Sequence, residues 1–222
     1  MKKIFTFLFV FILSLALFSG CKTDSGLFPY VSELRSDVFE GKSQTYHIKG
    51  AYGYKEDPFI NDKKVGKLVS NLHFRMINPT VDGAIYTITI ELNEQTLSSD
   101  FKLNPITHSL GVSVQLEDFS LKEFTIKISC SGAVEEVIMT SILPQNTISA
   151  STALKVFEKE QPSLIKNLTT TDGVFDAEIY LRVLVKDQKP YWYVGIARGN
   201  SELKALLIDG LTCEILAVRD II

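Results

Sequence analysis

Hydrophobic and polar residues alternate over several stretches of the chain, which is the pattern of a β-strand with one buried face. The alternation is clearest over residues 85–92, 111–116 and 124–130. Further candidate strands cover residues 44–49, 67–77, 96–103 and 134–142. Turn-forming pairs of Asn, Asp, Ser, Gly and Pro separate these stretches. About seven short strands in this order predict an antiparallel β-sandwich of immunoglobulin-like architecture over residues 27–145.

The hydrophobic period changes after residue 145. Apolar residues then recur at the three- and four-residue spacing of a helix, at Leu154, Phe157, Leu164, Ile165 and Leu168. Ser149 or Ser151 is available as the N-cap. Pro162 lies inside the stretch, and proline interrupts helical hydrogen bonding, so we expect a kink or two short helices.

Strand patterns return in the last quarter of the chain. They cover residues 179–185, 191–197, 203–209 and 214–219, with turn residues between them. A helix followed by four strands predicts a small α+β domain over residues 146–222, in which the helix packs on a four-stranded antiparallel sheet. The chain as a whole is therefore expected to be mostly β, in two domains.

The first twenty residues have a different character. Residues 1–3 carry two lysines, and residues 4–18 are apolar except for Thr6 and Ser14. This apolar run is shorter than the roughly 20 residues that a membrane-spanning helix needs. A basic start followed by a short apolar core is typical of a secretory signal peptide, which we assign to residues 1–20.

The end of this segment resembles the bacterial lipobox, in the residues Leu17-Phe18-Ser19-Gly20-Cys21. The resemblance implies that Cys21 is lipidated and becomes the mature N-terminus. Residues 21–26 would then form a short polar tether, and acyl chains would hold the protein at the cell membrane or the outer membrane, on its extracytoplasmic side. The alternative is an ordinary signal peptide with an incidental Cys21.

Composition and charge limit the classes of partner. The 222 residues are 45% hydrophobic, which is enough for a folded core, and carry 23 basic and 26 acidic side chains. Removal of residues 1–20 takes two lysines and no acid, so the formal net charge falls from −3 to −5. An acidic chain gives no general electrostatic reason to expect nucleic-acid binding.

Two cysteines remain after Cys21. In an extracytoplasmic compartment Cys130 and Cys213 could form one disulfide. The alternative is that Cys130 is a small buried residue, because it shares a strand face with Phe124, Ile126 and Ile128.

The C-terminal segment resembles a PepSY-type domain. The resemblance lies in residues 192–196 and in the hairpin of residues 206–216. In that hairpin the family pattern is matched by Asp209, Thr212, Glu214 and Ile215, while Cys213 stands in place of the usual glycine. The resemblance implies a helix packed on an antiparallel sheet, and a role in binding or modulating a peptidase or another envelope protein rather than in catalysis.

Motifs for catalysis or cofactor binding are missing from the sequence. Asp209 and Glu214 could form a carboxylate pair, but Asp209 is better interpreted as a cap of the turn. His47, His73 and His108 could converge on a metal, although scattered histidines are more often ordinary strand residues. We therefore expect no enzyme activity, no cofactor and no metal.

Aromatic residues offer the best candidates for a binding surface. Tyr52, Tyr54 and Phe59 follow Tyr46 in a stretch rich in Gly, Lys and Asp, where they could bind a ligand or cover the end of the sandwich. Trp192 lies between two tyrosines, and three consecutive rings must point to both faces of a strand.

These features favour a membrane-anchored, non-catalytic module that binds or modulates another protein. A lipid-anchored protein that binds a small molecule or glycan through the aromatic residues is the alternative. An envelope hydrolase without a short motif is a third hypothesis.

Overall fold

The computed structural model describes residues 26–58, 65–77, 79, 83–92, 95–105, 108–116, 119–199 and 201–220, with only the backbone of residues 201 and 202. The predicted signal peptide, Cys21 and Phe59 lie outside the described residues.

The described chain is mostly β, as the alternating pattern predicts. Its elements are η1 (Phe28–Tyr30), β1 (Val31–Lys42), β2 (His47–Glu56), β3 (Leu68–Ile77), β4 (Tyr86–Leu92), β5 (Gln95–Asp100), β6 (Lys102–Asn104), β7 (Ser109–Gln115), β8 (Glu123–Cys130), β9 (Ala133–Ser141), α2 (Ala150–Glu160), α3 (Pro162–Leu168), β10 (Glu178–Lys186), β11 (Lys189–Arg198), β12 (Ser201–Asp209) and β13 (Ile215–Asp220).

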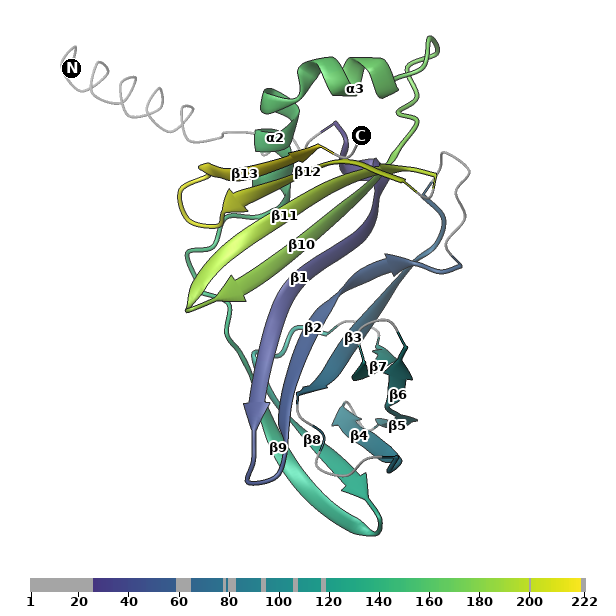
Figure 1. Cartoon of the computed structure of the whole chain (residues 1–222), viewed down its shortest axis with the longest axis vertical. Helices are drawn as coiled ribbons and strands as arrows, with labels where there is room; N and C mark the ends of the chain where they lie inside the picture. Colours follow the sequence, from purple (N-terminus) through teal and green to yellow (C-terminus); the bar gives the residue numbers. More distant parts are fainter. Residues whose placement is uncertain are drawn as a thin grey trace, which may run out of the picture.

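All thirteen strands in the described residues belong to one hydrogen-bonded sheet. Its main path runs β13-β12-β11-β10-β1-β2-β3-β7-β6, and β9, β8, β4 and β5 continue from the edge of β1 that also pairs with β10, further along the strand at Phe39 and Glu40. The pairing of β1 with β10 is parallel, whereas the other strand pairs are antiparallel. In Figure 1, β1 runs as one long ribbon through both halves of the molecule.

The first half of the sheet curls into a nearly closed, barrel-like shape. β1 pairs with β9 at Phe39 and Glu40, and β5 and β6, which are consecutive in the chain, pair with β4 and β7 respectively. The interior is filled by its own side chains, and the largest fully buried ones are Phe39, Ile48, Leu72, Phe74, Met76, Tyr86, Ile88, Ile90, Ile126 and Ile128. Burial of these apolar residues stabilises this half.

The second half is the sheet of β10 to β13, with α2 and α3 on one face (Figure 1). Leu154 and Phe157 of α2 share a buried core with Leu181, Val194 and Leu206 of the strands. The helical region follows the sequence prediction, because the Ser149 side chain accepts a hydrogen bond from the Thr152 N–H as N-cap and Pro162 begins a second helix. None of the described helices has the length and apolar content that crossing a membrane requires.

The two halves meet at a bend in β1. The pairing register between β1 and β2 shifts between Arg35 and Asp37, which leaves Ser36 as the extra residue of a bulge. Opposite the bulge, a Cβ on Gly53 would overlap the backbone of Leu34 and Arg35, so only glycine fits there.

The mostly-β prediction is confirmed, but the finer one is not supported. We expected an immunoglobulin-like sandwich over residues 27–145 and a separate α+β domain with its own four-stranded sheet. In the structure, β1 pairs with β2 and β9 in the barrel-like half and with β10 in the C-terminal half, so both halves share one sheet.

Candidate functional site

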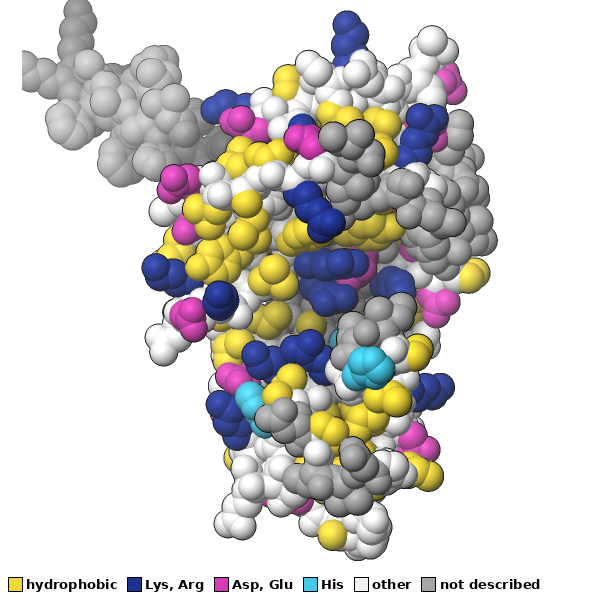
Figure 2. All heavy atoms as spheres, in the orientation of Figure 1, with side chains coloured by type: hydrophobic (Ala, Val, Ile, Leu, Met, Phe, Trp, Pro, Cys, Tyr) yellow, Lys and Arg dark blue, Asp and Glu magenta, His cyan; other side chains and the backbone are white. Residues whose placement is uncertain are grey.

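One face of the C-terminal sheet is covered by α2 and α3, and no described helix covers the other, which we call the open face. Strand alternation and register place on this face the side chains Glu33 and Arg35 of β1, Lys55 of β2, Glu178, Tyr180, Arg182 and Leu184 of β10, and Tyr191 and Tyr193 of β11. Figure 2 shows Lys and Arg side chains gathered in the middle of this face.

A carboxylate shared by two arginines forms the centre of the open face. Arg182 donates from Nε to Oε1 of Glu33 at 3.0 Å and from Nη2 to Oε2 at 2.6 Å, and Arg35 donates from Nε to Oε1 at 2.7 Å. Glu33 is only 8% exposed. Its burial raises the pKa, but the Arg182 hydrogen bond and the two arginine charges together hold the pKa below its ordinary value. The cluster of Glu33, Arg35 and Arg182 therefore carries a net charge of +1 at neutral pH.

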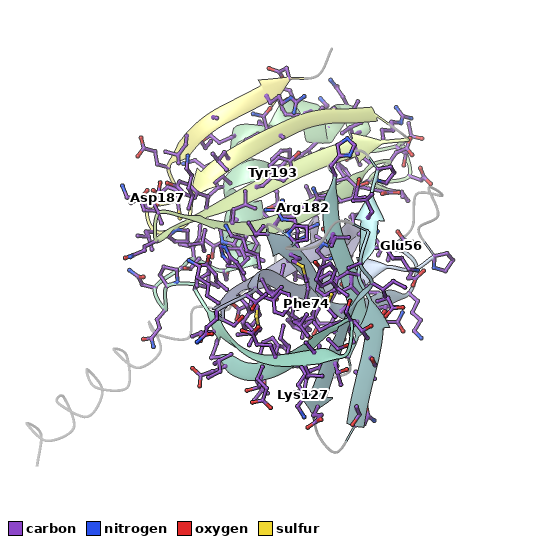
Figure 3. All side chains as sticks on the ribbon, turned by 60° about the horizontal axis from the view of Figure 1, so that its bottom comes forward. Glu56, Phe74, Lys127, Arg182, Asp187 and Tyr193 are labelled. Carbon is purple, nitrogen blue, oxygen red and sulfur yellow. The ribbon has the colours of Figure 1, made fainter. Side chains whose placement is uncertain are left out.

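Two tyrosines hold the Arg182 guanidinium in place. Its Cζ lies 5.3 Å from the ring centroid of Tyr180 and 5.9 Å from that of Tyr193, within the range of cation–π contacts. Figure 3 shows Arg182 and Tyr193 next to each other on this face. The Tyr180 hydroxyl donates to Oε2 of Glu178 at 3.2 Å. Burial, with the nearby Glu178 charge, raises the pKa of Tyr180 to about 12, so this ring stays neutral.

The positive character extends to the neighbouring strand β3. His73 is half-buried, with Nδ1 at 3.0 Å from Oγ of Ser113. Burial lowers the pKa of His73, and the charges of Arg35, Arg75 and Lys55 lower it further, against the opposing effect of Glu33. The open face is thus a cationic surface on a chain of net negative charge.

This arrangement suits recognition of an oxyanion. Within the described residues, the Arg35 side chain donates only through Nε, so its Nη1 and Nη2 keep their donors for a ligand. A planar guanidinium fork matches the geometry of a carboxylate or phosphate. The described residues contain no group of three His, Cys, Asp or Glu that could hold a metal.

Of the aromatic residues singled out in the sequence, Tyr52 and Tyr54 contact each other, whereas Trp192 lies in the other half of the sheet. Tyr52 is buried in the barrel-like core, and its hydroxyl lies 3.4 Å from that of the exposed Tyr54. Tyr54 and Phe119 line a pocket of about 1100 Å³ at the end of the barrel-like half. Phe59 lies outside the described residues.

Trp192 belongs to the core beneath the helices rather than to a surface. It is buried, and its Nε1 donates to the carbonyl oxygen of Ile148 at 2.9 Å. Its neighbours Tyr191 and Tyr193 are half-buried on the open face. The expectation that three consecutive rings divide between two faces is confirmed.

Sequence reasoning did not single out Glu33, Arg35 and Arg182 as candidate site residues. Glu33 and Arg182 are 149 positions apart, so nothing local links them. The available signal was the alternation in β10, which sets Tyr180 and Arg182 on the face opposite Leu181. Arginine and tyrosine are residue types enriched in binding hot spots, so their presence on the non-core face of one strand was the signal.

The hairpin with the PepSY-type resemblance has a well-defined turn. The Asp209 carboxylate accepts hydrogen bonds from the N–H groups of Leu211 at 2.8 Å and Thr212 at 2.9 Å, and these bonds lower its pKa. Glu214 is exposed. Asp209 therefore caps a turn, as the sequence favoured. Cys213, which replaces the glycine, adopts a φ of +67°, the conformation that glycine fits best.

The remaining cysteines and histidines have separate environments. Cys130 and Cys213 are both free, and Cys130 lies in the barrel-like core, which matches the reading of a small buried residue. His47 pairs with Glu40 at 2.6 Å between Nε2 and Oε1, and His73 contacts Ser113.

Comparison of the chain with protein-family models, curated proteins and solved structures found no match. The lipobox and PepSY-type resemblances therefore remain predictions from the residues that carry them.

Proposed function

We propose that this chain is a lipid-anchored, extracytoplasmic protein that acts without catalysis, by binding another protein. The PepSY-type resemblance makes a peptidase or another envelope protein the class of partner. The observation that carries the proposal is the open face, where arginines and tyrosines lie on strands whose opposite side is fully packed. Tyrosine and arginine are the residue types that most often dominate the energy of a protein interface.

The anchor part of the proposal rests on the sequence of residues 1–21. Cys21 precedes Gly26, the first described residue, by five positions, which an extended chain spans in roughly 17 Å. A lipidated Cys21 would thus keep the folded part close to the membrane surface. Cys21→Ser should abolish labelling by a fatty-acid analogue and release the chain from the membrane fraction. A Cys21→Ser chain that is still labelled would refute the anchor.

The binding part is tested by recovery from membranes. The Cys21-anchored chain is purified from solubilised membranes after cross-linking, beside a soluble form that begins at Lys22. We expect the anchored form to retain a defined protein partner. If neither form retains any partner above the background of an unrelated lipoprotein, the proposal fails.

A second function is favoured by the pocket at the end of the barrel-like half. Tyr54 and Phe119 line it together with Ser70 and Gln115, a mixture of apolar and polar groups that suits a small molecule or glycan. Thermal-shift screening against small glycans and apolar ligands tests this function. A hit should be lost in Tyr54→Ala and kept in Arg35→Gln, whereas a hit that depends on Arg35 would place the ligand on the open face instead.

A further inference from the structure

We infer that the open face binds the carboxylate side chains of an acidic segment of its protein partner, with Arg35 and Arg182 as the main contacts. The inference rests on the proposed function and specifies the chemistry of the partner. It starts from charge complementarity, because the described open face gathers cations while the chain as a whole is acidic.

The side chains of the open face carry more positive than negative charge, so the face attracts an anion. Glu33 neutralises one positive charge of the two arginines that share it. Lys55 and Arg75 add exposed positive charge close enough to lower the pKa of His73. A carboxylate that reaches Arg35 would meet four positive side chains, Arg35, Arg182, Lys55 and Arg75, against the carboxylates of Glu33 and Glu178, so the local potential is positive.

The arginines are already fixed before a ligand arrives. Glu33 holds both guanidiniums through Nε, and Tyr180 and Tyr193 flank that of Arg182. Fixing a side chain before binding reduces the entropy that association costs. Such preorganisation favours a defined, bidentate carboxylate contact.

The same features favour an acidic protein segment over an anionic lipid surface. Attraction to an anionic lipid surface is carried mainly by flexible exposed basic side chains and does not require a fixed fork. Arg182 is partly buried between aromatic rings, a setting typical of protein–protein hot spots. Tyr191, Tyr193 and Leu184 add apolar surface beside the charges, against which the backbone of a peptide can pack.

The test measures binding of a fluorescein-labelled decapeptide of alternating glutamate and serine by fluorescence anisotropy at low salt. The protein is the chain from Lys22 without lipid, which contains every described residue. A peptide with glutamine in place of glutamate, and vesicles of phosphatidylcholine with phosphatidylglycerol, are the comparison ligands. We expect the glutamate peptide alone to bind measurably, with affinity that falls as salt is added.

Matched variants locate the site. Arg35→Gln should weaken glutamate-peptide binding about ten-fold, which corresponds to about 1.4 kcal/mol. Lys127→Gln on β8 is the control, since its side chain is 37% exposed and pairs with Glu91 at 2.7 Å, against 39% and 2.7 Å for Arg35 and Glu33. The control should change affinity less than two-fold. Lys55→Gln, an exposed change on the same face, should weaken binding about three-fold and covers the case in which Arg35→Gln fails to fold.

Three results would overturn the inference. The first is that the glutamate peptide does not bind, and the second is that Lys127→Gln lowers peptide affinity as much as the open-face variants do. The third is that vesicles bind more tightly than the peptide and that their binding is weakened by Arg35→Gln or Lys55→Gln in the same way. The partner recovered from membranes separates this inference from the proposed function. A partner retained equally by the wild-type chain and by an open-face variant contradicts the acidic contact and leaves the proposed function standing. A wild-type chain that retains no partner contradicts the proposed function itself.

Discussion

The two faces of the C-terminal sheet use alternate residues of the same strands in opposite ways. On the helix-covered face, Leu181, Val194 and Leu206 are fully buried against α2. On the open face, Arg182 and Tyr193 are partly exposed and contact each other. Strand β10 thus contributes to stability through one set of residues and presents charge through the other.

This difference separates what holds the fold from what is available for binding. Substitutions on the covered face should change stability strongly, because they open a cavity in a packed core. Substitutions on the open face should change stability less and binding more. Variants on the two faces test that division.

Truncation of Leu206 and of its neighbour Leu207 in β12 should lower the free energy of unfolding by different amounts. Leu206→Ala removes a fully buried side chain and should lower the free energy of unfolding by about 3 kcal/mol. Leu207→Ala, on the half-buried open side opposite Tyr193, should cost about 1 kcal/mol. Urea unfolding of both variants measures the difference. Equal losses would show that the open face is packed as tightly as the covered one.

Glu33→Gln tests the charged centre of the open face. At pH 7 the substitution should lower the free energy of unfolding by about 2 kcal/mol, less than for a fully buried ion pair because Arg35 and Arg182 are partly solvated. The pKa of Glu33 is lowered in the folded state, so its charge contributes stability above the ordinary value of 4.5. That contribution is lost as the pH falls from 4.5 through the folded pKa.

The measurement is urea unfolding of the wild type and Glu33→Gln from pH 7 to pH 3. The difference in the free energy of unfolding between the wild type and Glu33→Gln should become smaller below pH 4.5. A difference that stays constant to pH 3 would mean that the carboxylate charge is not what stabilises this cluster.

Cys213→Gly should have the smallest effect and the opposite sign. Cys213 adopts a φ of +67°, which costs a residue with a side chain about 1 kcal/mol relative to glycine. The glycine variant should therefore unfold at a higher temperature, with binding at the open face unchanged. A lower melting temperature would mean that contacts of the Cys213 side chain outweigh the backbone strain.

The parts of the fold that depend on local pattern could be predicted from the sequence. The alternation of residues 124–130 matches β8, and Pro162 divides the helical stretch between α2 and α3. The covered face of β10 also follows from alternation, because its buried residues recur at every second position.

Strand β1 could not be predicted in this way. In a regular strand, residues on one face are an even number of positions apart. The bulge at Ser36 interrupts this alternation, so Leu34 and Phe39, which both point into buried regions, are five positions apart. The parallel pairing of β1 with β10 joins residues almost 150 positions apart. The contacts of Glu33 with Arg182 depend on that pairing, so the candidate binding face could not be predicted from the local sequence pattern.

The central claim, that the open face binds a protein partner, is tested most directly by site-specific photo-cross-linking in cells that carry the full chain. A photoreactive amino acid replaces Leu184 on the open face or Ile138 on β9, which are 41% and 59% exposed. We predict a discrete cross-linked protein at Leu184 that is absent at Ile138 and is reduced by Arg35→Gln. Cross-linking that is equal at the two positions, or absent at Leu184, would contradict the claim.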